Sequence, residues 1–126
     1  MSVTGYGYAS LLEASSASTC IYFGIIIKIL GGMENSSYGA HTLIGPNCSL
    51  YTPQHPIDYL QRRKTIESAF PIKIGEDCWL GGNVTVCPGV TIGDRTVIGA
   101  GSVVTHDIPS DCMAAGNPCK VIRQLI

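Results

Sequence analysis

Charged residues are scarce in this sequence, and their signs nearly balance. They make up 13% of the 126 residues, and the formal net charge is −1. Nucleic acids and anionic membranes are held largely by basic surfaces, which this composition does not supply. We therefore predict neither kind of partner. The low charge fits a surface that is partly buried against other subunits, and it fits equally a single chain whose surface carries few charges.

Long apolar runs are missing as well. The most apolar stretch, CIYFGIIIKIL at residues 20–30, is interrupted by Lys28 and is too short to span a bilayer. The residues before it include Glu13 and no basic segment, which does not match a signal peptide. These two absences lead to the prediction of a cytoplasmic protein.

Ligand and disulfide patterns are also absent. The six cysteines include no CxxC pair and have no regular spacing, which favours buried free thiols in a reducing compartment. The three histidines, His41, His55 and His106, have separations that match no local zinc pattern. We predict no metal site.

What the sequence does contain is a repeat of six residues. An aliphatic side chain returns at every sixth position, and a second register of mostly small residues follows each aliphatic by four positions. The first register is Ile74, Leu80, Val86, Ile92, Ile98 and Val104, and the second is Cys78, Val84, Val90, Thr96 and Ser102. This period fits neither an amphipathic helix nor an alternating strand. It is typical of hexapeptide repeats that coil into a parallel β-helix, so the predicted fold class is all-β.

Glycine follows several of these aliphatics directly. We expect Gly75, Gly81, Gly93 and Gly99 to supply the left-handed backbone conformations that a turn every six residues needs. No GxGxxG or GxxxxGK[ST] pattern accompanies them, so they do not indicate a phosphate-binding loop.

The repeat starts earlier, at Tyr38, Ile44 and Leu50, and is interrupted before Ile74. The sequence therefore predicts a diverged N-terminal segment at 1–37, partly a first coil, and a β-helix domain at 38–126 with an excursion loop at 51–71. Prolines 53, 56 and 71 would stiffen this loop. Long excursions from a regular scaffold often carry function.

His55 lies in this loop, in the segment TPQHPID. A histidine can accept a proton near neutral pH, so His55 is a candidate general base, although a packing or surface role fits the residues equally well. Asp58 and Glu67 are candidates to orient its ring. Trp79, the one tryptophan, stands next to the inward register, and we expect it exposed at a corner of the coil, against a subunit or a ligand.

The blocks from Tyr38 to Arg123 resemble the maltose and galactoside O-acetyltransferase family of hexapeptide-repeat, left-handed β-helix acyltransferases. The resemblance is carried by GPN at 45–47, LYTPQHPID at 50–58, FPIKIGEDCWLGGNVTVCPGVTIGD at 70–94, VIGAGSVVTHDIP at 97–109 and AAGNPCKVIR at 114–123. It implies a homotrimer with active sites between subunits, and transfer of an acetyl group from acetyl-CoA to a hydroxyl of a sugar such as maltose, glucose or a galactoside.

The resemblance also implies roles for individual residues. His55 would be the general base that deprotonates the acceptor hydroxyl, Glu67 would orient and charge-balance it, and Trp79 would flank the acceptor. Positions along the coil and tail would bind acetyl-CoA: Gly82, Ala100 and Thr105 beside the pantetheine arm, and Lys120 and Arg123 near the phosphates. Lys120 and Arg123 are three apart, and the tail that carries them is expected as a short strand or a helical turn.

One stretch departs from the family. The family has an asparagine and an aspartate in a segment resembling NFNCxILD, where this chain has CIYFGIIIKILGG. The sequence is therefore compatible with an active O-acetyltransferase and also with a catalytically impaired trimeric homologue that binds CoA or acts as an assembly module.

Overall fold

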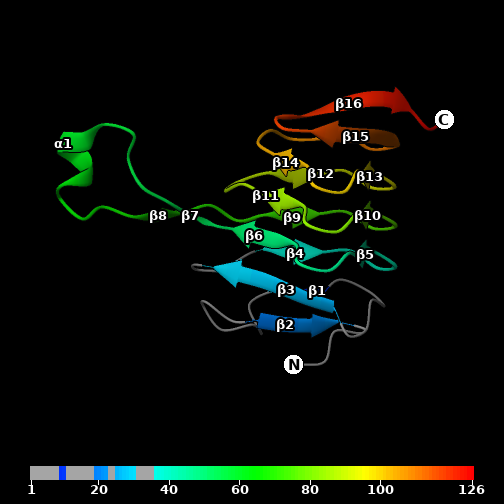
Figure 1. The fold of residues 1–126 in the computed structure, drawn as a ribbon, viewed down its shortest axis with the longest axis horizontal. Helices are drawn as coiled ribbons and strands as arrows, with labels where there is room; N and C mark the ends of the chain where they lie inside the picture. Colours follow the sequence, from blue (N-terminus) through cyan, green and yellow to red (C-terminus); the bar gives the residue numbers. More distant parts are fainter. Residues whose placement is uncertain (1–8, 11–18, 23–24, 31–35) are drawn as a thin grey trace.

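A computed structural model describes residues 9–10, 19–22, 25–30 and 36–126, with side chains from residue 36 onward. It is a coil of short strands with one arm that projects from its side (Figure 1). Most of the predicted N-terminal segment, 1–37, lies outside the described residues. Of the stretch CIYFGIIIKILGG at 20–32, which stands where the family has NFNCxILD, residues 20–22 and 25–30 are described. Among the described residues, none forms a helix long and apolar enough to cross a membrane.

The regular coil has a strand at every sixth residue. These strands are β4 (Ser37–Tyr38), β5 (Leu43–Ile44), β6 (Ser49–Tyr51), β9 (Lys73–Ile74), β10 (Trp79–Leu80), β11 (Thr85–Val86), β12 (Thr91–Ile92), β13 (Val97–Ile98) and β14 (Val103–Val104). Strands in the same position of successive turns pair in parallel, so that Lys73 pairs with Thr91, eighteen residues on. One turn of the coil is therefore three strands, and the predicted parallel β-helix is confirmed.

The paired strands form three faces. Face 1 has the order β1–β4–β9–β12, face 2 the order β16–β15–β13–β10–β5, and face 3 the order β14–β11–β6–β3–β2. The chain runs through them in turn, so each turn has a corner between faces 1 and 2, one between faces 2 and 3, and one between faces 3 and 1. The other strands of these three faces are β1 (Ala9–Ser10), β2 (Thr19–Tyr22), β3 (Ile25–Leu30), β15 (Cys112–Gly116) and β16 (Cys119–Gln124).

Both predicted registers point inward. All the aliphatics from Ile74 to Val104 are buried, and so is the second register from Cys78 to Ser102. In each strand pair the residue before the aliphatic faces out, as in the exposed Trp79 beside the buried Leu80. Alternation of this kind follows from the period of two along a strand.

The prediction for the glycines was wrong about their backbone. Gly75, Gly81, Gly93 and Gly99 do not have positive φ angles; the left-handed positions come two residues later, at Asp77, Asn83, Arg95 and Gly101, with φ between 53° and 76°. The glycines after the aliphatics are needed for close approach instead. A Cβ on Gly81 would lie 2.7 Å from the backbone nitrogen of Ala100 in the next turn.

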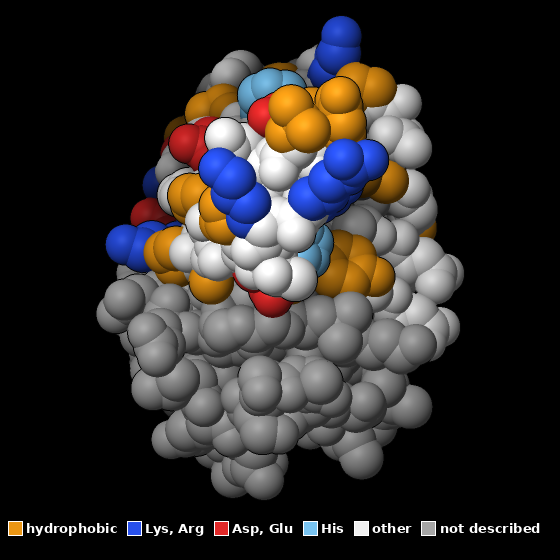
Figure 2. All heavy atoms as spheres, turned by 90° about the vertical axis from the view of Figure 1, so that its left-hand side faces the viewer, with side chains coloured by type: hydrophobic (Ala, Val, Ile, Leu, Met, Phe, Trp, Pro, Cys, Tyr) orange, Lys and Arg blue, Asp and Glu red, His pale blue; other side chains and the backbone are white. Residues whose placement is uncertain are grey.

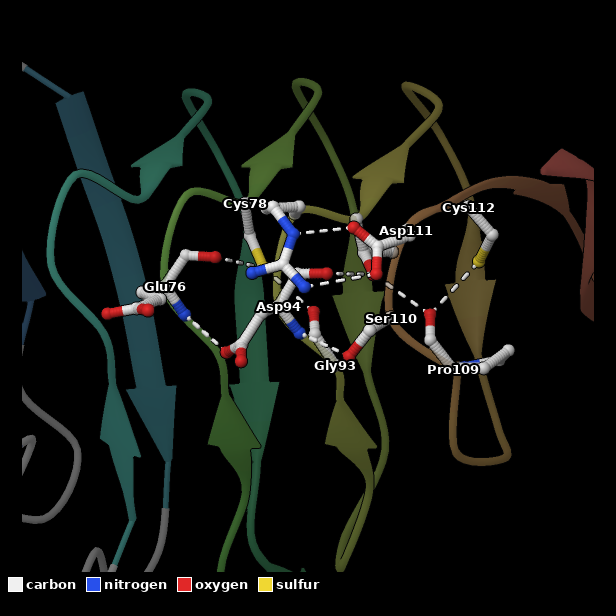
Figure 3. A network of polar contacts seen from close by, with 10 residues as sticks. Glu76, Cys78, Gly93, Asp94, Pro109, Ser110, Asp111 and Cys112 are labelled. Atoms are coloured by element: carbon white, nitrogen blue, oxygen red, sulfur yellow. Dashed lines mark hydrogen bonds and ion pairs between the residues drawn. The ribbon is translucent and has the colours of Figure 1, made fainter. Parts of the chain in front are cut away.

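The inner corner between faces 1 and 2 is held by a column of buried hydroxyl and thiol groups (Figure 3). Thr42 Oγ1 donates to Gly75 O at 2.7 Å, and Cys78 Sγ donates to Gly93 O at 3.0 Å. Thr96 and Cys112 both donate to Pro109 O at 3.0 Å. These side-chain donors hydrogen-bond corner carbonyls inside the coil, where polar groups need partners.

The arm leaves the coil at the corner between faces 3 and 1. Ser37 pairs with Lys73, thirty-six residues on, so the arm adds one turn's length of chain without adding a turn. The arm, residues 53–70, contains the antiparallel pair β7 (Pro53–Gln54) and β8 (Ser68–Ala69) and the helix α1 (Tyr59–Arg62). The amide of Phe70 donates to Thr52 O at 3.0 Å and closes its base.

A hairpin ends the coil. β15 pairs in parallel with β13 and antiparallel with β16. The tail is thus a strand, one of the two predicted alternatives. At the other end of face 3, β2 and β3 also form an antiparallel pair.

Candidate functional site

His55 lies at the start of the arm, directly after β7. It lines a pocket of about 120 Å³ together with Gln54, Pro56, Ser68 and Phe70. The pocket therefore combines apolar surfaces with an amide, a hydroxyl and an imidazole. Such a mixture suits a small ligand that has both hydroxyl groups and apolar faces, as a sugar does.

The tautomer of His55 follows from its hydrogen bond to the main chain of the arm. Its Nδ1 lies 3.1 Å from the carbonyl oxygen of Ile66. A carbonyl can only accept, so in the neutral ring Nδ1 carries the proton and Nε2 has a free lone pair. His55 is thereby prepared to accept a proton at Nε2.

The two carboxylates considered as orienting groups are placed differently. Asp58 is the N-cap of α1 and accepts from the amide of Leu60 at 3.2 Å. Glu67 is exposed next to Ile66 and makes no hydrogen bond or ion pair with any described residue. In the single chain, the group that orients His55 is the Ile66 carbonyl. The role of Glu67 remains a prediction.

Trp79 is exposed, as expected, but it lies in strand β10 and not at a corner. Its side chain is 56% exposed. Its register partners on face 2 are Leu43 and Val97. It therefore belongs to an apolar column on the outer side of this face.

Gly82 and Ala100 lie at the same corner, between faces 2 and 3, in successive turns. The amide of Gly101 donates to Gly82 O at 2.9 Å, which ties the two turns together. Thr105 lies at the corner between faces 3 and 1, where its Oγ1 is 2.9 Å from Nδ1 of His106. Two of the three predicted pantetheine positions are thus neighbours, and the third lies across face 3.

Lys120 and Arg123 share one side of β16 because of a β-bulge. Lys120 pairs with Ala115 and Arg123 pairs with Met113, with a register shift between Met113 and Ala114. Residues three apart in a regular strand would face opposite ways, but Ala115 and Met113 are two apart and face the same way. Both cations are exposed and make no ion pair with a described residue, so their charge is available to an anion.

The predicted site residues form two groups within one chain. His55 and Glu67 are on the arm at the corner between faces 3 and 1, whereas Trp79, Lys120 and Arg123 are on face 2 (Figure 1). Because each turn has three sides, face 2 lies opposite that corner. A ligand that contacts His55 and Trp79 together must therefore lie between two copies of the chain.

The described cysteines are poor candidates for a nucleophile. Cys48, Cys78, Cys112 and Cys119 are buried free thiols, as predicted, and Cys87 is half-buried. Burial raises the pKa of each of these five thiols, which keeps them protonated. No group of three or more His, Cys, Asp or Glu side chains within the described residues is arranged to hold a metal ion.

Sequence reasoning missed some of the residues around His55. The Ile66 carbonyl, Ser68 and Phe70 reach the histidine because β7 and β8 pair, and no periodicity in the arm indicates that pairing. The apolar column of face 2 could have been found, because Leu43 and Val97 precede aliphatics of the repeat just as Trp79 does.

Residues 71–106 match the bacterial transferase hexapeptide (six repeats) family. The galactoside O-acetyltransferase of Escherichia coli strain K12 is 49% identical over 87 residues, which cover 69% of this chain and 43% of that protein. The crystal structure of a maltose O-acetyltransferase from Clostridium difficile 630 superposes with a TM-score of 0.68 at 51% identity, over 70% of this chain and 47% of that one.

A galactoside acetyltransferase in complex with coenzyme A superposes with a TM-score of 0.69 at 41% identity, over 79% of this chain and 50% of that one. These neighbours have the left-handed β-helix fold, so the coil is a left-handed parallel β-helix, as predicted. The chain spans less than half the length of the curated relatives that it matches.

Proposed function

Because this chain belongs to the hexapeptide-repeat acyltransferases, the family of the maltose and galactoside O-acetyltransferases, we propose that it transfers an acetyl group from acetyl-CoA to a hydroxyl of a sugar. The observation that carries the proposal is the hydrogen bond from Nδ1 of His55 to Ile66 O, at 3.1 Å. In the neutral ring this bond leaves the lone pair of Nε2 free, and His55 lines a pocket whose polar and apolar groups suit a sugar.

The reaction needs one base and no covalent enzyme intermediate. Nε2 of His55 takes the proton of the acceptor hydroxyl as its oxygen attacks the thioester carbonyl carbon of acetyl-CoA. The carbon–sulfur bond then breaks, and the leaving thiolate of CoA takes the proton from His55. Direct transfer is supported by the burial and raised pKa of the described thiols, which leave none of them suited to carry the acetyl group.

Acetyl-CoA would lie along the coil and tail. Lys120 and Arg123, which share one side of β16 and have no described acidic partner, fit the phosphates of CoA. Gly82 and Ala100 present backbone at one corner, where an extended pantetheine chain can pair with peptide groups. The chemistry of these donors thus fits a CoA thioester as co-substrate.

We propose that the working assembly is a homotrimer with its sites between subunits. His55 and Trp79 lie on opposite sides of one chain, so an acceptor bound to a single chain could contact only one of them. This separation supports the arrangement. Glu67, whose carboxylate makes no hydrogen bond or ion pair with a described residue of its own chain, would then orient and charge-balance His55 in that assembly.

An acetyl-CoA thiol-release assay over a panel of sugars tests the proposal. We expect sugar-dependent release that His55→Ala reduces by at least about a hundredfold, the usual size of a general-base contribution. His41→Asn is the matched control, because residue 41 is at a corner with φ 58° and asparagine occupies the equivalent left-handed positions 47 and 83.

If the protein binds CoA but no acceptor causes thiol release, the alternative function is favoured, that of an impaired homologue that keeps the CoA groove. Release that is unchanged in His55→Ala would refute the role given to His55.

A further inference from the structure

The helix of the arm is too short to be stable by itself. α1 has four residues, Tyr59–Arg62, and none of them is buried. A single helical turn gains few hydrogen bonds for the backbone entropy that it loses, so it needs further contacts to persist. Contacts that hold α1 also fix the chain on either side of it, where His55 and Ile66 lie.

Arg62, the last residue of α1, ties the helix to the chain that follows His55. Its Nη1 donates to Pro56 O at 3.3 Å and to Ile57 O at 3.2 Å. These are the two residues directly after His55. A charged donor makes the stronger kind of hydrogen bond, and Arg62 forms no ion pair with a described acidic side chain. The guanidinium of Arg62 therefore binds the main chain of the arm.

The main chain of Arg62 holds the other side of the loop. Its carbonyl oxygen accepts from the amide of Thr65 at 3.1 Å. Thr65 has φ 55°, a left-handed conformation that reverses the chain after the helix. Ile66 follows at once, and its carbonyl oxygen lies 3.1 Å from Nδ1 of His55. The position of the carbonyl that orients His55 thus depends on the turn that Arg62 closes.

The two chains of the arm have few other links beyond its strand pair. β7 and β8 pair only as far as Gln54 and Ser68. In the arm, all of which the structure describes, the hydrogen bonds that join the outgoing and returning chains beyond this pair are the one at His55 and those of Arg62. The contacts of Arg62 therefore support the bond between His55 and Ile66.

Arg63, the next cation along the chain, has a different environment. Its guanidinium carbon lies 5.3 Å from the centre of the Tyr59 ring, a cation–π contact between two exposed side chains. The Arg63 side chain makes no hydrogen bond or ion pair with a described residue. Figure 2 faces the side from which the arm projects and shows basic and hydrophobic side chains together at the surface. Arg63 thus offers a matched comparison, with the same charge but no bond to the chain after His55.

We propose that Arg62 is a positioning residue for His55. It holds the arm so that Ile66 O accepts from Nδ1, and Nε2 keeps its lone pair for the acceptor hydroxyl. The inference rests on the proposed function only for the reaction at Nε2, because the orientation of the ring depends on contacts within the arm. Without the Arg62 side chain, the two chains can move apart, and the His55 ring loses the carbonyl that selects its tautomer.

The first measurement is the tautomer of His55. Ring nitrogen chemical shifts in NMR spectra report it at a pH where the ring is neutral, and the His55→Ala chain assigns the signals. We expect the tautomer protonated at Nδ1 to predominate in the original chain and in Arg63→Ala. Arg62→Ala should lower the ratio of this tautomer to the other by roughly threefold to tenfold, the effect of losing one typical hydrogen bond.

Arg62→Lys is the conservative variant. Both bonds to the chain after His55 come from one nitrogen, Nη1, and lysine also ends in one nitrogen that donates. Arg62→Lys should therefore keep part of the tautomer preference that Arg62→Ala loses. Circular dichroism and sedimentation of each variant verify that the coil is folded and assembled as in the original chain.

Steady-state kinetics give the second measurement. Arg62→Ala should lower kcat about tenfold, less than the roughly hundredfold that a displacement of about 1 Å can cost, and should leave the KM for acetyl-CoA unchanged. Guanidinium ion, at concentrations too low to unfold the protein, should restore part of the rate of Arg62→Ala because it can occupy the place of the lost group. It should not restore His55→Ala, and sodium chloride at the same ionic strength should restore neither.

An unchanged tautomer ratio in Arg62→Ala would overturn the proposal, whatever the activity. Equal losses of kcat in Arg62→Ala and Arg63→Ala would also contradict it, since charge alone would then matter. A raised KM for the sugar with unchanged kcat would place Arg62 against the acceptor instead. If the tautomer ratio changes as expected but the original chain acetylates no acceptor, the proposed function fails while the role of Arg62 in orienting His55 stands.

Discussion

Replacing Gly45 by alanine is expected to lower the free energy of unfolding by about 2–3 kcal/mol, a cost typical of overpacking in a tight interior. A Cβ at this position would lie 2.6 Å from the backbone nitrogen of Gly82 and 2.7 Å from the backbone carbon of Gly81. Both atoms belong to the main chain of the next turn, which cannot rotate away as a side chain can. Relief therefore requires the turns to separate.

Gly101 is the comparison. It lies at the same corner, but there the backbone conformation requires glycine and close approach does not. A Cβ there would meet nothing within 4 Å, but its φ is +76°. Gly101→Ala should therefore cost about 1 kcal/mol, the conformational penalty alone. Gly101→Asn should cost less than Gly101→Ala, since asparagine tolerates this conformation and Asn83 adopts it one turn earlier.

Urea unfolding followed by circular dichroism measures all three variants. They must be compared at one chain concentration, because assembly shifts the apparent stability. A Gly45→Ala variant no less stable than Gly101→Ala would refute the conclusion that close approach, and not backbone conformation, requires glycine after the aliphatics.

Three further outcomes follow from the contacts. Cys78→Thr should be about 1 kcal/mol more stable than the isosteric Cys78→Val in urea unfolding, because threonine keeps a donor to Gly93 O; equal stabilities would contradict this. The pKa of Asp111 is lowered by its hydrogen bond and charge interaction with Arg95, so the stabilisation it provides is complete above the ordinary aspartate pKa of 3.8 and is lost as the pH falls below it. Asp111→Asn should therefore flatten the loss of stability in a pH series below about 4, and an unchanged slope would argue against the ion pair. Trp79, 56% exposed in one chain, should show blue-shifted emission and less acrylamide quenching on assembly, whereas an unchanged spectrum would leave face 2 uncovered.

The coil could be predicted from sequence because its rule is local and repeated. Every sixth residue from Ile74 to Val104 is buried, and one inward side chain per strand is enough to set the register of the whole stack. The residue that precedes each aliphatic faces outward for the same reason, as Trp79 does.

The local cause of the turns could not be read in the same way. Gly75 and its equivalents were predicted to be the left-handed residues, yet Asp77 and Arg95 take that conformation, which is uncommon for residues other than glycine. The distinction depends on how closely the next turn approaches, at distances such as the 2.7 Å at Gly81. That is a property of the stacked coil and not of six residues in sequence.

The contacts within the arm could not be predicted from the sequence either. Its composition indicated an excursion and pointed to His55, but the hydrogen bond to Ile66 depends on the pairing of β7 and β8 across thirteen intervening residues. Of the two partners expected by charge, Asp58 caps α1, and Glu67 makes no hydrogen bond or ion pair with a described residue. A pairing outside the repeat leaves no periodic signal.

Subunit mixing tests most directly whether acetyl transfer takes place between two copies. Chains carrying His55→Ala and chains carrying Trp79→Ala are each expected to be nearly inactive, and they are to be unfolded together, refolded in equal amounts and assayed with acetyl-CoA and a sugar. Sites between copies predict recovery of about one quarter of the original activity, since about one interface in four would combine an intact His55 arm with an intact Trp79 face. Activity no higher than that of the two variants assayed separately would contradict a shared site.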